Sequence, residues 1–263
     1  MPVRLRYFTD PACPASWAAE PAVRRLISEF GEEVRITYVM SGLARELEPP
    51  HETRILDWLD HADRSGMPVD PRLWREGPIR STYPACMAVK AAAEQGADAA
   101  ARYLRALREG LMCMRRKLDA PEALVEEARA AGLDVQRFRI DLGSHAIVEA
   151  FGADLDTTRA VPPEPFAFPT FEFASETGSE WVFGEADHAV LSAAARTAGA
   201  RSPGTPAPDV PAALGAFGRM ATAEVEAVCD LPGPRAHAEL WRLAAEWRVK
   251  PVRVLTGYLW EPA

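Results

Sequence analysis

Hydrophobic and polar residues alternate in two short segments near the start of the chain. In residues 3–8 and again in residues 34–40, every second position is apolar, and this period of two predicts a strand in each segment. Between them, residues 14–30 carry apolar side chains at steps of three and four, which predicts a helix. A helical connection of this length favours a parallel strand pair with a right-handed crossover.

The middle of the chain has a different pattern. From about residue 52 to residue 151, apolar positions follow helical spacing and strand-like runs are almost absent. Residues 166–173 then alternate aromatic side chains, and residues 180–184 form a second apolar run, so a β-hairpin with a loop over about 174–179 is expected. Residues 187–198 follow as a helix, with an aspartate as its N-cap. The predicted order is β-α-β, a helical insertion, and β-β-α.

The end of the chain contains a proline-rich break and a short tail. Residues 201–211 hold four prolines, which indicates a linker. The tail predicts helices over 222–228 and 236–247 and a strand or hairpin over 251–260, an order that weakly resembles a winged helix-turn-helix. Arg242 is the only interior positive charge of the second helix, whereas a recognition helix needs basic and amide side chains. Packing or contact with a partner is therefore favoured over DNA binding.

Composition narrows the function classes further. A chain of 263 residues with 48% hydrophobic residues can form one or two domains with a sizeable core. A formal net charge of −8 argues against broad nucleic-acid binding, which requires a basic surface. No apolar run approaches the ~20 residues of a membrane span, and the N-terminus lacks the apolar stretch of a secretory signal. A cytoplasmic protein without a membrane partner is expected.

The cysteines and histidines show no metal-binding pattern. The four cysteines contain no C-x-x-C pair, and the five histidines lack H-E-x-x-H or H-x-x-x-H spacing, so no metal site is expected. In a cytoplasmic chain the cysteines are expected to be reduced. Cys86, Cys113 and Cys229 are interpreted as packing residues.

Cys13 is the cysteine whose sequence position favours a reactive thiol. It follows the first strand and precedes Pro14, a residue suited to the first position of a helix. The sulfur would face free backbone N–H groups and the positive end of the helix dipole, which together lower a thiol pKa below ~8.5. Ser16 can donate a hydrogen bond to the sulfur but cannot form a disulfide with it. We therefore predict a nucleophilic Cys13 that alkylates fastest of the four; the alternative is a small buried side chain left from a lost active site.

A second unusual feature is Phe168-Pro169-Thr170, where a proline precedes a strand. Proline removes a donor from the hydrogen-bond ladder, so this position indicates a sheet edge, a bulge or a cis peptide bond. A cis proline would leave the preceding backbone groups free to pair with an extended ligand. We therefore expect Phe168, Pro169 and Thr170 to bind substrate.

Together these features resemble the DsbA family of thioredoxin-fold proteins. A strand, C-P-x-S opening a helix, a second strand, a long helical insertion and x-P-T before a hairpin follow the family's order. Phrases such as Asp10-Pro11, Glu20-Pro21 and Tyr83-Pro84-Ala85 resemble its cytoplasmic FrnE-like and ClpXP-adaptor-like branches. The resemblance covers about residues 3–199. It implies an α/β thioredoxin-like fold with a large all-helical insertion and a small C-terminal α+β appendage.

The implied division has four parts. They are a thioredoxin-like domain over 1–48 and 152–200, an inserted helical domain over 49–151, a proline-rich linker over 201–213, and a helical, winged-helix-like appendage over 214–263.

The resemblance implies thiol–disulfide oxidoreductase or isomerase activity on a protein or small-molecule thiol or disulfide. The family's second motif cysteine is Ser16 here, so a single-cysteine mechanism with catalytic Cys13 and Ser16 is expected. We expect Pro14, Ala15 and Trp17 to bind substrate together with the proline segment over 168–170. No cofactor is expected apart from a low-molecular-weight thiol as co-substrate.

Two alternatives stay open at this stage. One is a non-enzymatic adaptor that keeps the fold as a binding surface. The other is a small-thiol-dependent isomerase or transferase that resembles 2-hydroxychromene-2-carboxylate isomerases and kappa-class glutathione transferases. In that case Arg115-Arg116-Lys117, otherwise a solvated helix end, would contact the anionic thiol.

Overall fold

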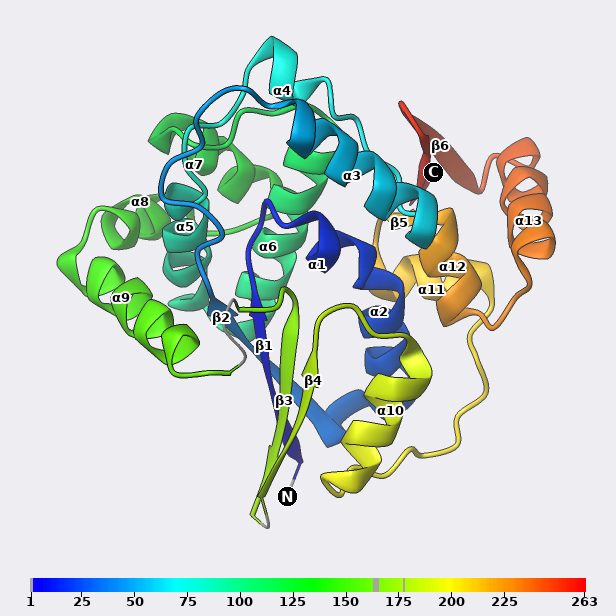
Figure 1. Cartoon of the computed structure of the whole chain (residues 1–263). Helices are drawn as coiled ribbons and strands as arrows, with labels where there is room; N and C mark the ends of the chain where they lie inside the picture. Colours follow the sequence, from blue (N-terminus) through cyan, green and yellow to red (C-terminus); the bar gives the residue numbers. More distant parts are fainter. Residues whose placement is uncertain (1, 163–165, 177) are drawn as a thin grey trace.

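The computed structural model describes residues 2–162, 166–176 and 178–263. Met1, residues 163–165 and Thr177 of the predicted hairpin loop lie outside the described residues. Figure 1 shows a central sheet with a block of helices on one side and a small C-terminal unit on the other.

The central sheet has the strand order β2-β1-β3-β4. Strand β1 (Val3–Thr9) pairs in parallel with β2 (Val34–Met40), as the helical crossover predicts. Strand β3 (Thr170–Ser175) runs antiparallel to β1 and forms the expected hairpin with β4 (Gly178–Phe183). This strand order and the β-α-β, helical insertion, β-β-α sequence of elements agree with the thioredoxin-like fold expected from the sequence.

The crossover contains two helices where the sequence predicted one. Helix α1 (Pro14–Ala18) ends before α2 (Glu20–Phe30), and the short helix η1 (Gly31–Glu33) leads into β2. The break follows from Pro21, which has no N–H to donate to the carbonyl four residues earlier. Helix α2 and the later α10 (His188–Thr197) pack against the sheet, and Asp187 caps α10 by accepting the N–H of Val190.

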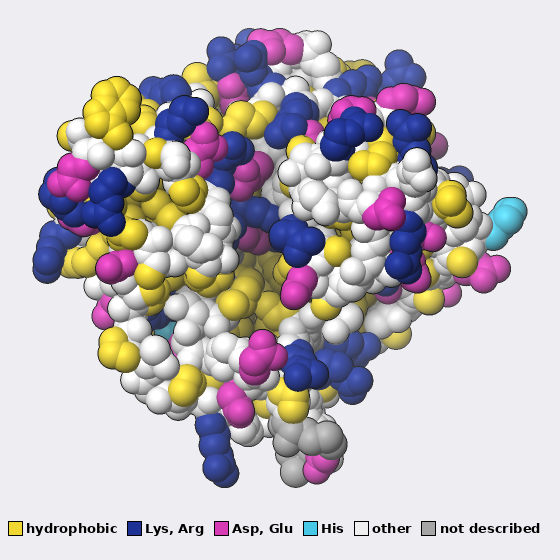
Figure 2. Space-filling view, turned by 180° about the vertical axis from the view of Figure 1, so that it is seen from behind, with side chains coloured by type: hydrophobic (Ala, Val, Ile, Leu, Met, Phe, Trp, Pro, Cys, Tyr) yellow, Lys and Arg dark blue, Asp and Glu magenta, His cyan; other side chains and the backbone are white. Residues whose placement is uncertain are grey.

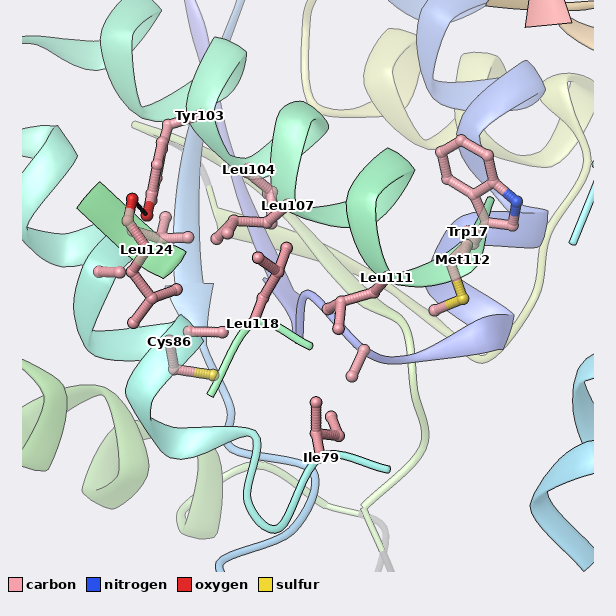
Figure 3. Close-up of a cluster of buried hydrophobic side chains, with 14 of the residues drawn as sticks. Trp17, Ile79, Cys86, Tyr103, Leu104, Leu107, Leu111, Met112, Leu118 and Leu124 are labelled. Carbon is pink, nitrogen blue, oxygen red and sulfur yellow. Dashed lines mark hydrogen bonds between the residues drawn. The ribbon is translucent and has the colours of Figure 1, made fainter. Parts of the chain in front are cut away.

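The helical insertion lies between β2 and β3, and its apolar core extends to Trp17 of α1 and to Leu259 of the C-terminal unit. Figure 3 shows apolar side chains along one side of α6, among them Tyr103, Leu104, Leu107 and Leu111, facing Leu118 and Leu124. The short helix α4 is the element that the periodicity did not reveal, because four residues make only about one turn. No helix among the described residues is long and apolar enough to cross a membrane. The helices of the insertion are α3 (Glu52–Ser65), α4 (Leu73–Glu76), α5 (Tyr83–Ala93), α6 (Ala97–Met112), α7 (Pro121–Ala130), α8 (Val135–Leu142) and α9 (His145–Arg159).

The C-terminal unit starts earlier than the sequence predicts. Its first helix begins at Val210, inside the predicted linker, because the Asp209 side chain accepts the N–H of Ala212 and caps it. The unit has a small core of its own around Val225, Leu240 and Trp260. A three-stranded sheet in the order β5-β7-β6 completes it. The elements are α11 (Val210–Phe217), β5 (Met220–Ala221), α12 (Thr222–Val228), α13 (Gly233–Ala245), β6 (Val249–Val254) and β7 (Gly257–Pro262).

Buried and half-buried charges join the C-terminal unit to the rest of the molecule. Glu224 of α12 is fully buried and accepts hydrogen bonds from Arg105 of α6 at 2.7 and 2.9 Å. Its Oε1 also lies 3.0 Å from Nε of Arg24 on α2. The cluster contains four arginines and four glutamates, so its formal charges balance. We call it the interdomain charge cluster, and it consists of Glu20, Arg24, Arg105, Arg108, Glu109, Arg219, Glu224 and Glu261.

Candidate functional site

Cys13 occupies the position that the sequence predicts, at the start of the first helix. It is the N-cap of α1, and its Sγ accepts the backbone N–H of Ser16 at 3.3 Å. Pro14 is the first helical residue. The motif therefore has the local geometry that would favour a thiolate if the sulfur were open to solvent.

The sulfur is sealed instead. Cys13 is 2% exposed, and Pro14, Ala15, Ser16 and Trp17 are buried with it. Burial raises the pKa of the Cys13 thiol to about 11, and Ser16 and the positive charge of Arg108 offset only part of that rise. The expectation of a lowered pKa is wrong, because α1 has only five residues and its dipole does not compensate for the loss of water.

Ser16 contacts the sulfur through its backbone. The Ser16 hydroxyl, predicted to donate to the sulfur, is fully buried and faces the sulfur closely enough to lower the pKa of Cys13, although it makes no hydrogen bond of ordinary geometry among the described residues. Trp17 is fixed from two sides, because its Nε1–H donates to the carbonyl of Pro68 at 3.0 Å and the Arg105 guanidinium lies 4.5 Å from its ring centre. The motif thus packs directly against the interdomain charge cluster.

Asp10 holds the loop that carries Cys13. One carboxylate oxygen accepts the N–H of Ala12 at 2.7 Å, and the other accepts the N–H of Leu43 at 2.7 Å and the Thr82 hydroxyl at 2.6 Å. Cys86 also donates to Asp10, at 3.2 Å. Burial raises the pKa of Asp10, although these four donors oppose the rise. The sequence contained a signal for this role, an aspartate between a strand and a proline, but we assigned it no function.

Arg108 is a second buried group that sequence reasoning did not assign. It is 1% exposed, pairs with Glu20, donates to the Thr9 hydroxyl and lies 5.5 Å from the ring centre of Tyr7. An arginine within the amphipathic pattern of α6 gives no sign that it points inward. Its role depends on how α6 packs against the end of β1.

The predicted proline segment lies just before β3, at the end of the sheet where β1 finishes. The Phe168–Pro169 peptide bond is cis, and the next residue, Thr170, pairs with Phe8 near the end of β1. The Pro169 carbonyl already accepts the N–H of Gly184 at 2.7 Å, and the Thr170 hydroxyl donates to the carbonyl of Ala167 at 2.6 Å. These two groups are therefore occupied within the protein. Phe168 is half-buried and remains accessible.

An open groove of about 270 Å³ borders the motif. Trp58 and Trp74 form part of its wall, and Arg54 lies over the Trp74 ring at 5.7 Å from the ring centre. Of the predicted substrate-binding residues, Pro14 contributes to the lining, whereas the sulfur of Cys13 does not. Among the described residues, no group of three or more His, Cys, Asp or Glu side chains could hold a metal ion. The groove lining comprises Ala12, Pro14, Leu43, Ala44, Leu47, Arg54, Asp57, Trp58, Trp74 and Thr82.

Comparisons with known proteins identify what this chain is similar to. A thioredoxin family model matches residues 7–180. A protein named ClpXP adapter protein SpxH from Halalkalibacterium halodurans is 30% identical over 98% of this chain and 88% of its own length. The protein of the same name from Shouchella clausii is 31% identical over 99% of this chain and 88% of its own length.

Among solved structures, a putative protein disulfide isomerase from Nitrosomonas europaea is similar with a TM-score of 0.67 and 19% identity. The aligned region covers 75% of this chain and 97% of the Nitrosomonas europaea chain. A probable DsbA oxidoreductase from Streptomyces coelicolor has a TM-score of 0.60 and 19% identity, and covers 77% and 93% respectively. At this identity the two structures establish a shared fold.

Proposed function

Because this chain belongs to the thioredoxin family and, within it, to the family of the SpxH proteins, we propose that it is a non-enzymatic adaptor that brings a protein to ClpXP in the cytoplasm. The observation that carries the proposal is the sealed sulfur of Cys13, which is 2% exposed, whereas thiol–disulfide exchange needs a sulfur that a substrate can reach. This favours the adaptor alternative over the single-cysteine oxidoreductase that the motif first suggested.

Thiol–disulfide exchange makes demands that this site opposes. The attacking species is a thiolate with access to a disulfide sulfur, and both burial and a pKa of about 11 work against it. The resolving position holds Ser16. The described cysteines are all buried and unpaired, so none is an obvious replacement, and they are Cys13, Cys86, Cys113 and Cys229.

The surface beside the motif suits binding. The 270 Å³ groove offers the exposed side chain of Leu43 beside the half-buried Arg54, and the buried rings of Trp58 and Trp74 support its wall. The bonds of Asp10 hold the groove-lining residues Ala12, Leu43 and Thr82 in fixed positions. A fixed apolar groove lowers the entropic cost of binding an apolar side chain of a partner.

The decisive experiment combines a binding assay and a thiol assay. Purified ClpX from the same organism is titrated against the full chain and against Cys13→Ala, and both are assayed for reduction of insulin disulfides and of glutathione disulfide. We expect the two chains to bind ClpX equally and to show the same background thiol activity. Cys13-dependent disulfide exchange, a glutathione adduct on Cys13 in native mass spectra, or absence of ClpX binding would each contradict the proposal.

Leu43 offers a matched test of the groove. It lines the groove and is 40% exposed, whereas Leu56 on α3 is 66% exposed and is not part of the lining. We expect Leu43→Asp to weaken adaptor-dependent degradation of a client by ClpXP, and Leu56→Asp to leave it unchanged.

A further inference from the structure

A second cleft lies between the helical insertion and the C-terminal hairpin. It has a volume of about 310 Å³ and brings together arginines from three separate segments. Arg72 precedes α4, Arg115 follows α6, and Arg253 lies near the end of β6. Met114, Val254 and Leu255 supply apolar wall between them. Figure 2 shows that acidic and basic side chains are interspersed over one face of the molecule, so a cleft where basic groups predominate is a local feature.

The charges of this cleft are not balanced. Asp70 accepts two hydrogen bonds from the Arg72 guanidinium, at 2.8 and 2.6 Å, and its Oδ2 lies 3.4 Å from Nε of Arg115. Burial alone would raise the pKa of Asp70, but the bonds from Arg72 outweigh burial and lower it, so this carboxylate is ionised. Arg115 also pairs with Glu76. Three arginines therefore face two carboxylates, which leaves about one positive charge uncompensated.

Arg253 is the arginine that carries this surplus. It lies over the ring of Tyr258, 4.8 Å from the ring centre, and has no carboxylate partner among residues 2–162, 166–176 and 178–263. The neighbouring Arg116, which the sequence grouped with Arg115, pairs with Glu127 and does not line the cleft.

The cleft is held in shape before any ligand arrives. The Thr256 hydroxyl accepts the N–H of Val69 at 2.8 Å and lies 3.2 Å from its carbonyl, which ties the hairpin tip to the segment that carries Asp70. Arg115 has a φ of 54°, a left-handed conformation that non-glycine residues adopt at a cost of about 1 kcal/mol or more. This left-handed residue ends α6, because the N–H of Arg116 donates to the carbonyl of Gly110 at 2.8 Å, and it thereby fixes the backbone that carries Arg115.

We propose that this cleft binds an aspartate or glutamate side chain from an acidic segment of a protein partner, with Arg253 as the principal contact. A carboxylate carries one negative charge and would neutralise the one uncompensated positive charge of the cleft. A phosphate dianion would leave the cleft with a net negative charge. The planar guanidinium donates two parallel hydrogen bonds to a carboxylate. Met114 and Leu255 would contact the aliphatic stem or an apolar neighbour. The identity of the occupant as a protein segment rests on the proposed adaptor function.

The test uses direct binding to the full chain, so it does not depend on ClpX. Two peptides with acetylated and amidated ends, Gly-Leu-Glu-Gly and Gly-Leu-Gln-Gly, are titrated while the arginine Nε–H signals are followed by nuclear magnetic resonance. We expect saturable shifts of Arg253 and Arg115 with the glutamate peptide alone. Arg253→Gln should weaken binding at least tenfold. Lys250→Gln removes the same charge from the same strand, at a side chain that is 70% exposed, and should leave binding unchanged.

Several outcomes would overturn the proposal. They are equal shifts with both peptides, no saturable shift with the glutamate peptide, equal loss in the Arg253 and Lys250 variants, or tighter binding of inorganic phosphate than of the glutamate peptide. Because ClpX is absent from this assay, a failure of the adaptor proposal would leave the peptide result intact, and a failure here would leave ClpX binding intact.

Discussion

The motif around Cys13 and the interdomain charge cluster are neighbours with opposite electrostatics. Burial raises the pKa of Cys13 to about 11, so the thiol stays protonated and neutral. Burial would also raise the pKa of Glu20, but Arg108, Arg105 and Arg24 outweigh it and lower that pKa. A buried group keeps its charge where enough opposite charges are arranged around it, and becomes neutral where they are not.

This contrast changes how the motif is understood. In this chain the C-P-x-S segment and Trp17 form a packed joint between the sheet, the helical insertion and the C-terminal unit. The same dense packing that removes the sulfur from water makes the surrounding surface rigid. The proposed adaptor function accordingly depends on surface contacts with a partner. The experiments that follow test whether the Cys13 motif is neutral and the interdomain charge cluster is ionic.

The largest effect is expected from Glu224→Gln. This change leaves one surplus positive charge among buried side chains, and breaking a buried ion pair costs about 3–5 kcal/mol. Urea denaturation should show a loss of this size, and the segment before α11 should become more sensitive to proteases. Glu239→Gln, which removes an exposed pair with Arg242, is the control and should cost less than about 1 kcal/mol. Equal losses in the two variants would contradict the role of the cluster.

The second prediction concerns the reactivity of Cys13. A pKa raised from 9.0 to about 11 reduces the thiolate fraction at pH 8 by about a hundredfold, and burial slows the reaction further. Alkylation by iodoacetamide, followed for each cysteine by peptide mass spectrometry, should therefore be at least that much slower in the native chain than in urea. The native rate should still be rising at pH 10. A native rate equal to the unfolded one would restore the single-cysteine mechanism.

The third prediction is a loss of stability in acid that depends on Glu20. The pKa of Glu20 is lower in the folded chain than in the unfolded chain. The contribution of Glu20 to folding stability is therefore complete above the ordinary glutamate pKa of ~4.3, and it disappears as the pH falls through the pKa of the folded chain. One such proton changes the free energy of unfolding by at most about 1.4 kcal/mol per pH unit. Melting temperatures between pH 3 and pH 7 should fall less steeply for Glu20→Gln than for the unaltered chain. Parallel curves would show that Glu20 is not held ionised.

The smallest effect is expected from Ser16→Ala. The Ser16 hydroxyl is buried, faces the Cys13 sulfur and makes no hydrogen bond of ordinary geometry among the described residues, so its removal should change stability by less than about 1 kcal/mol. Its backbone N–H, which contacts the sulfur, is unaffected by the change. Chemical denaturation measures the effect. A destabilisation well above this size would show that the hydroxyl makes a full-strength hydrogen bond with the sulfur or with water.

Local patterns predicted most of the elements, and the misses have physical causes. Alternation and helical spacing located β1, β2, the hairpin and the helices of the insertion except the one-turn α4. The break between α1 and α2 was missed because helical periodicity continues across Pro21, although its missing N–H ends the ladder. The start of α11 was missed because the prolines around it indicated a linker, while the cap formed by Asp209 is a single side chain.

The sequence by itself determined the thioredoxin-like fold, the position of Cys13 at a helix start and the replacement of the second motif cysteine by Ser16. These follow from local patterns and from the order of segments along the chain. Only the tertiary structure decided that the sulfur is sealed, that Arg108 and Glu224 are buried as partners, and that Arg72, Arg115 and Arg253 share one cleft. The reason is that a side chain's charge and reactivity depend on its distance from water and from other charges. Those distances arise when segments far apart in the sequence pack together.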